Sequence, residues 1–229
     1  MTDTILSTNA SILDGRTDEA LPGMQVLVEG DRIREFSDKP LGSASARTID
    51  LRGKTLMPGL IDCHVHVVAA LVDLGRNALL PDALIAYHAA HIMRGMLGRG
   101  FTTVRDVGGA TFALVQALQE GLIEGPRLVI CGKALSRTGG HADFRGRYDG
   151  RDTGYKTRRL GALGRVCDGV DTGRAAARDE IRQGATFVKI WTADRCPVVR
   201  RTTLLQVLQG TEVLLGQGAG PCESSIDAG

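Results

Sequence analysis

Residues 58–66 read Pro-Gly-Leu-Ile-Asp-Cys-His-Val-His, and the pattern of this 229-residue chain changes there. The apolar residues of this stretch predict a strand, on which side chains two positions apart point to the same face. The imidazoles of His64 and His66 can therefore converge on one metal ion, and neutral imidazole suits zinc and its neighbours. Two surface or hydrogen-bonded histidines are the structural alternative, because a His-x-His pair alone is a weak pattern.

The residues before this stretch predict short strands joined by turns. Glu29-Gly30-Asp31 lies between two apolar runs and is typical of a hairpin. We expect a small antiparallel β-sheet domain over residues 1–57. Its predicted strands are Thr4–Asn9, Met24–Glu29, Arg32–Phe36 and Arg47–Leu51.

The residues after it alternate between helical and strand patterns, which predicts a parallel α/β sheet. Asp171 is the expected N-cap of the last of these helices. The predicted helices are Pro81–Arg99, Ala110–Gly121 and Asp171–Gln183. The predicted strands are Thr102–Val107, Arg127–Cys131 and Thr186–Trp191.

Lys189 is a second candidate for chemistry, since it lies in the apolar run Phe187-Val188-Lys189-Ile190-Trp191. A buried lysine without a partner is costly, and burial favours its neutral amine. That amine could act as a nucleophile or take up CO2 as a carbamate. The alternative, slightly favoured by the spacing alone, is a lysine at a strand end whose ammonium group reaches water.

Three further features are open to a functional and a structural interpretation. The glycines before His141 could direct its imidazole at a ligand, although an ordinary loop histidine is the simpler interpretation. Asp106 ends a predicted strand, where α/β folds place their sites, but a carboxylate capping the next helix is favoured. The basic segment Arg145–Arg165 contains interspersed aspartates and is typical of a solvated loop.

The composition excludes several classes of protein. Lys and Arg number 28 against 26 Asp and Glu, so the net charge of +2 disfavours a nucleic-acid surface. No apolar run is long enough to cross a membrane, and the first ten residues lack a secretory pattern. The five cysteines are scattered without a CxxC pair. We therefore expect reduced thiols in a cytoplasmic protein with no membrane or nucleic-acid partner.

The order of these motifs resembles that of the amidohydrolase superfamily. Residues 58–66 match its first barrel strand, Pro-Gly-x-Ile-Asp-x-His-x-His, which is the most specific part of the resemblance. Gly100–Asp106 is similar to the second strand. Leu135–His141 and Gly184–Ile190 resemble the branch of prolidase-like dipeptidases, related carboxypeptidases and imidazolonepropionase-like enzymes. The resemblance covers about residues 5–193.

The resemblance implies the N-terminal half of a (β/α)8 TIM-like barrel after the small β-sheet domain. It implies that His64 and His66 hold a divalent metal, zinc, in a site for one or two ions. Lys189, carboxylated by CO2, would bridge two metals, and His141 would lie beside the substrate as a catalytic residue. The implied reaction is hydrolysis of a C–N amide bond, in a dipeptide or a cyclic amide, by a metal-activated water. Self-association into a homo-oligomer is left open.

The chain departs from the family pattern after Lys189. The family has two further histidines and a late aspartate as ligands, whereas all five histidines of this chain precede residue 142. We expect barrel strands one to four over residues 58–194 and a non-homologous, disordered tail over residues 195–229. That tail resembles the read-through of a shifted frame, which predicts a truncated or frameshifted chain of little or no hydrolase activity.

Two alternatives stay open at this point. One is a non-catalytic fragment, or a scaffold or binding relative without hydrolase activity. The other is a split enzyme, in which another chain supplies strands five to eight.

Overall fold

The first sheet of the protein is built around the long strand β1, which lies between β2 and β4. The structure is a computed structural model that describes residues 4–42 and 45–191. It divides the chain into two units, Met1–Gly59 and Leu60–Gly229. The strands of the first unit are β1 (Thr4–Ile12), β2 (Leu21–Glu29), β3 (Arg32–Ser37), β4 (Arg47–Asp50) and β5 (Thr55–Leu56).

This sheet is mixed, so the expectation of a purely antiparallel sheet is wrong. The hairpin predicted at Gly30 is confirmed, since β2 and β3 pair antiparallel around it. However, β4 and β5 run parallel to β1. The physical reason is the connection from Ser37 to Arg47, which is long enough to pass β2 and return beside β1. A tight turn there would have placed β4 antiparallel to β3.

The second unit contains a parallel sheet in the order β6-β7-β8, with helices between successive strands. Helix α2 begins after Pro81 and ends before Gly100, whose φ of +91° suits a helix end. This confirms the predicted alternation of the three strands and two helices. Their bounds are β6 (Leu60–Val65), α2 (Asp82–Gly98), β7 (Phe101–Asp106), α3 (Phe112–Gln119) and β8 (Arg127–Ile130).

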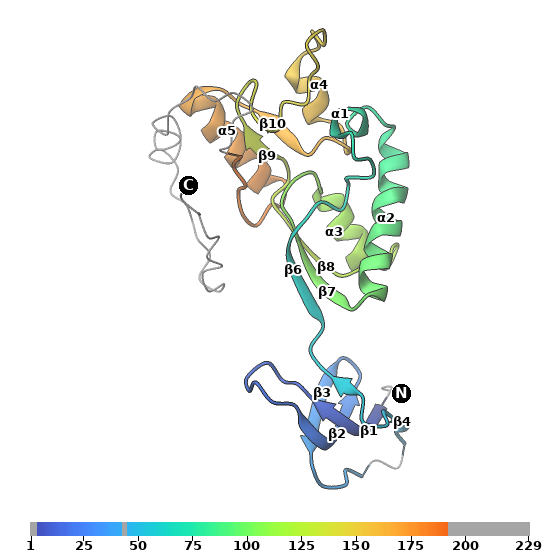
Figure 1. The fold of residues 1–229 in the computed structure, drawn as a ribbon. Coiled ribbons are helices and arrows are strands. Elements are labelled where there is room, and N and C mark those ends of the chain that lie inside the picture. Colours follow the sequence, from blue (N-terminus) through green and yellow to red (C-terminus); the bar gives the residue numbers. More distant parts are fainter. Residues whose placement is uncertain (1–3, 43–44, 192–229) are drawn as a thin grey trace. The chain divides into compact units, whose positions relative to one another are not determined.

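The main core lies between this sheet and the two helices, which Figure 1 shows beside it. Ile85, Ala89 and Met93 of α2 are four residues apart and fully buried, so they form one face of the helix. They pack in the same cluster as Val104 of β7 and Leu128 of β8. Val65 of β6 belongs to this cluster too, so the packing fixes all three strands of the sheet.

Strand β6 lies at an edge of its sheet within the described residues, because only β7 pairs with it. Leu60 and Ile61 on this strand are 41% and 66% exposed. An edge strand with exposed apolar side chains offers unpaired backbone groups to a further strand.

The segment after β8 departs from the predicted pattern. The expected strand Thr186–Trp191 is wrong, since it forms only an isolated parallel bridge between Leu135 and Ile190. The cause is Gly132, whose φ of +69° turns the chain aside between β8 and β9. The segment therefore meets β8 only at Thr186, and β9 only near its own end. The remaining elements are α1 (Leu74–Asn77), β9 (Ala134–Ser136), α4 (Thr153–Thr157), β10 (Gly164–Val166) and α5 (Gly169–Arg182).

The N-cap expected at Asp171 is also wrong. Helix α5 begins at Gly169 with Asp168 as its N-cap, and Asp171 lies in its first turn. The carboxylate of Asp168 accepts hydrogen bonds from Thr138 instead of capping the helix. Sequence alone could not show that this distant threonine competes for the carboxylate.

No helix of the described residues is long and apolar enough to cross a membrane. The three cysteines that the structure describes, Cys63, Cys131 and Cys167, are free of disulfides. The predicted tail over residues 195–229 lies outside the described residues, and the cytoplasmic location stays a prediction.

Candidate metal centre

The two histidines of residues 58–66 lie together at the end of β6. His64 lies within β6, and His66 is the first residue after the strand ends. Their ring centroids are 5.7 Å apart and the ring planes meet at 79°. The two imidazoles are therefore close to each other as expected, and their binding of one metal ion stays a prediction.

His66 is held by the turn that follows β7. Its Nδ1 lies 3.0 Å from the carbonyl oxygen of Gly108. Because a carbonyl oxygen can only accept, this contact assigns the proton to Nδ1 and leaves a lone pair on Nε2. A histidine that donates through one ring nitrogen to a carbonyl group is the usual arrangement of a metal ligand.

The surroundings of His64 favour its neutral form. Partial burial lowers the pKa of His64, and the positive charge of Lys189 lowers it further. A neutral imidazole is the form that binds metal.

Asp106 at the end of β7 fixes the backbone of the residue after His66 and the backbone of the turn that follows β7. It is fully buried, and its carboxylate accepts N–H groups of Val67 at 2.7 Å, Gly108 at 3.0 Å and Ala110 at 3.2 Å. Burial raises the pKa of Asp106, while these three hydrogen bonds oppose the rise. The favoured interpretation of Asp106 as the cap of the next helix is wrong, because the N-cap of α3 is Thr111 and Asp106 accepts N–H groups of the two loops before that helix.

Lys189 is half-buried, and its backbone is tied to β9. Leu135 donates to the carbonyl of Lys189 at 2.8 Å, and Trp191 donates to the carbonyl of Leu135 at 2.9 Å. Within residues 4–42 and 45–191, no group of three or more His, Cys, Asp or Glu side chains could hold a metal ion. The His64 and His66 imidazoles are thus the donors that the described residues bring together, and a role for the Lys189 amine stays a prediction.

His141 comes near this centre through the indole of Trp191. The His141 and Trp191 rings are 4.9 Å apart, and the Trp191 and His66 rings are 6.3 Å apart. Phe144 joins the same group, with its ring 6.4 Å from Trp191. Sequence reasoning missed Trp191, although its position two residues after Lys189 was a signal.

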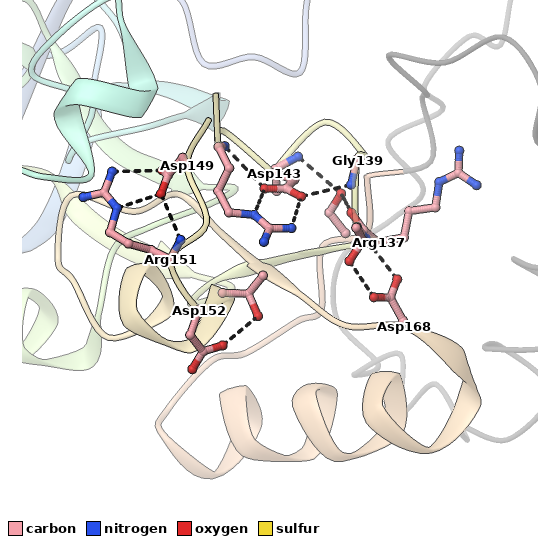
Figure 2. A network of polar contacts seen from close by, with 12 residues as sticks. Arg137, Gly139, Asp143, Asp149, Arg151, Asp152 and Asp168 are labelled. Carbon is pink, nitrogen blue, oxygen red and sulfur yellow. Dashed lines mark hydrogen bonds and ion pairs between the residues drawn. The ribbon is translucent and has the colours of Figure 1, made fainter. Parts of the chain in front are cut away.

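Two carboxylates hold the loop that carries His141, as Figure 2 shows. Asp143 accepts the backbone N–H of Gly139 at 3.0 Å and two guanidinium N–H groups of Arg145 at 2.7 Å. Asp168 accepts the N–H and hydroxyl of Thr138. The expected interspersed charges of this loop thus form local ion pairs, Arg145 with Asp143 and Arg151 with Asp149.

The Asp143–Arg145 pair gives a testable dependence of stability on pH. The hydrogen bond from Arg145 lowers the pKa of Asp143 to about 2. A carboxylate with a depressed pKa stabilises the fold above its unfolded pKa, near 4, and loses this effect as the pH falls toward 2. We expect Asp143→Asn to lower the free energy of unfolding by up to about 2 kcal/mol at pH 7, and by little at pH 2. Urea unfolding at both pH values measures this, and a pH-independent difference would contradict it.

Sequence reasoning also missed a lysine that is almost fully buried. Lys133 is 6% exposed and is the third residue after the end of β8. Lys189, in contrast, is only half-buried. The signal was a lysine in the run Cys131-Gly132-Lys133-Ala134-Leu135, which is as apolar as the run around Lys189.

Comparison with known proteins assigns this chain to a family. The sequence profile of the Amidohydrolase family matches residues 55–206, which include β6, both histidines and Lys189. The chain belongs to the amidohydrolase family.

Other amidohydrolases are similar over most of this chain. The ochratoxinase of Aspergillus niger is 34% identical over 181 residues, which are 72% of this chain and 37% of that enzyme. A crystal structure of an amidohydrolase is 52% identical with a TM-score of 0.76. A prolidase complexed with N-methylphosphonate-L-proline is 47% identical with a TM-score of 0.78. Each of these two structures matches 82% of this chain and 46% of its own, so this amidohydrolase chain spans less than half the length of these relatives.

Proposed function

We propose that the chain carries the metal-binding part of a metal-dependent amidohydrolase that cleaves a C–N amide bond. In this proposal His64, His66 and Lys189 hold a divalent metal, zinc, as one or two ions. The fold would be the N-terminal half of a (β/α)8 barrel. The supporting observation is the His66–Gly108 hydrogen bond of 3.0 Å, which leaves Nε2 of His66 free beside the His64 ring.

The residues present fit such a metal. Two neutral imidazoles are borderline donors that suit zinc. Lys189 becomes an anionic ligand when its neutral amine adds to CO2, which forms a carbamate and releases one proton. Zinc in such a site supplies a water nucleophile at neutral pH and polarises the amide carbonyl.

The side chains around the metal would orient the substrate. His141, on a loop fixed by Asp143 and Asp168, would donate a hydrogen bond to the substrate carbonyl or bind a carboxylate. Trp191 and Phe144 beside it would exclude water from that side. The substrate would be a dipeptide or a cyclic amide, and the proline-containing ligand of the similar prolidase favours a dipeptide that ends in proline.

A zinc titration tests this proposal without requiring turnover. We expect His66→Ala to weaken zinc binding by more than the roughly 10- to 100-fold loss typical of an outer-shell change. His64→Ala should act in the same direction. His88→Ala, an exposed histidine on α2, is the matched control and should leave the affinity unchanged. The fluorescence of Trp191, the only tryptophan of the chain, and a competing chelator report binding.

Equal affinities of all four proteins for zinc, or no zinc binding by the wild type, would overturn the metal site. Carboxylation is read separately from the carbamate signal of Lys189 after addition of 13C-bicarbonate. Low turnover of Xaa-Pro dipeptides by the zinc-loaded chain would agree with the predicted weak or absent activity.

The non-catalytic alternative is favoured by one observation. No cluster of three or more His, Cys, Asp or Glu donors occurs in the part of the chain that the structure describes. A scaffold or binding relative would need no metal at all. The same titration separates the two, because only the hydrolase proposal requires His66 to bind zinc.

A further inference from the structure

The ammonium group of Lys133 lies in a nest of backbone carbonyl groups. Its Nζ is 3.2 Å from the oxygen of Gly109, 2.9 Å from that of Arg159 and 2.5 Å from that of Ala162. The oxygen of Leu160 is a longer contact at 3.5 Å. An ammonium group has three donors, so the three shorter contacts account for all of them.

The backbone of Lys133 is fixed as firmly as its side chain. Its N–H donates to the buried carboxylate of Glu180 at 2.9 Å, and Arg165 donates to the other oxygen of that carboxylate at 3.3 Å. Glu180 also supplies the nearby negative charge that a buried ammonium group requires. Lys133 is therefore anchored at both ends, while burial lowers its pKa to about 8.

The nest joins directly to the candidate metal centre. Gly109, which accepts from Lys133, is the neighbour of Gly108, whose carbonyl holds Nδ1 of His66. The Gly109 N–H donates to the carbonyl of Gly132 at 2.8 Å, so the turn is tied twice to the segment of Lys133. Gly109 has a φ of +112°, a conformation that favours glycine, and glycine has no side chain that could secure the turn.

We propose that Lys133 is a positioning residue for the metal centre, which orients His66 by fixing the Gly108–Gly109 turn. The proposal rests on the proposed function, because the orientation of His66 matters through the metal. Lys133 does not reach the metal itself. Its role is to make one ring orientation of His66, with the proton on Nδ1, the stable one before any metal binds.

Zinc titration of the full chain with Lys133→Ala tests the proposal. We expect the zinc affinity to fall by about 10- to 100-fold, as for other losses of outer-shell support. Propylammonium chloride, which can place an ammonium group in the vacated nest, should restore most of the affinity. Propanol, of similar size but uncharged, should not. Lys54→Ala, an exposed lysine of the first unit, is the control and should leave the affinity unchanged.

A second measurement separates this proposal from the metal site. In the metal-free chain, nitrogen-15 shifts of the His66 ring should show the proton on Nδ1 in the wild type. In Lys133→Ala the proton should move largely to Nε2, the form preferred by free histidine. If the wild type binds no zinc but the ring proton still moves, the proposed function fails and the positioning role stands.

Three results would overturn the positioning role. One is an unchanged ring proton together with unchanged zinc affinity in Lys133→Ala. Another is an affinity restored equally by propanol, which would show that only volume is needed. The third is failure of both Lys133→Ala and Lys133→Gln to fold even with propylammonium present. That outcome would assign Lys133 to the stability of the whole unit.

Discussion

Replacing Asp106 by alanine should lower the free energy of unfolding of the second unit by roughly 4 kcal/mol. The carboxylate is fully buried and accepts three backbone N–H groups, those of Val67, Gly108 and Ala110. Its removal leaves these donors without an acceptor inside the protein, which is the costly half of losing a buried hydrogen bond. Urea unfolding followed by the fluorescence of Trp191, in the same unit, measures the change.

Two further variants make this result specific. Asp106→Asn keeps one oxygen but turns an amide N–H₂ group toward a backbone donor, so we expect about half the loss, roughly 2 kcal/mol. Asp50→Ala removes an exposed carboxylate that also accepts two hydrogen bonds, from Asn9 and Arg52. It should change stability by less than about 1 kcal/mol. A loss at Asp106 no larger than at Asp50 would show that the buried bonds contribute little.

Replacing Asn77 by alanine should cost roughly 3 to 5 kcal/mol in the free energy of unfolding. Asn77 ends α1 and is fully buried, and its amide makes four hydrogen bonds. Its Oδ1 accepts from Ala70 at 3.0 Å and Leu71 at 3.1 Å, and its Nδ2 donates to Val68 at 3.0 Å and Gly161 at 2.7 Å. One side chain therefore joins the loop after β6 to a segment 84 residues away.

The aspartate variant provides an internal check. Asn77→Asp keeps the acceptor but sets a buried carboxylate against two carbonyl oxygens, which raises the pKa of that carboxyl. Its stability should be greatest below about pH 4, where the carboxyl is protonated in both states, and should fall as the pH rises through the folded pKa. Gln119→Ala, at an exposed helix end, should stay within about 0.5 kcal/mol of the wild type. A pH-independent Asn77→Asp would contradict the assigned hydrogen bonds.

The fold could be predicted from sequence where local pattern and tertiary packing agree. The alternation from β6 to β8 followed from apolar periodicity, and Pro81 and Gly100 marked the ends of α2. The direction of β4 could not be predicted, because pairing with β1 or with β3 is decided across a connection without a pattern of its own. The strand expected at Thr186–Trp191 failed because the turn at Gly132 removed a continuous partner, which no residue of the segment itself encodes.

The candidate site, like the fold, could be predicted from the sequence only in part. The spacing of His64 and His66 predicted their proximity, because two residues so close in sequence need no long-range information. The hydrogen bond from His66 to Gly108 spans 42 residues and could not be predicted. Lys189 and Lys133 lie in similar apolar runs, yet only Lys133 is almost fully buried. Burial of a lysine depends on which carbonyl groups the fold assembles around it, and those of Lys133 come from two separate segments, at Gly109 and at residues 159–162.

If the proposed metal site forms, the position of β6 at the edge of its sheet would couple assembly to metal affinity. The strand that carries His64 has a backbone partner on one side only within the described residues. A strand that pairs with its open edge would restrict the motion of both imidazoles and so strengthen their hold on zinc. By thermodynamic reciprocity, zinc would tighten that pairing by the same factor. The metal would then act as a cooperative partner in completing the sheet as well as in the chemistry.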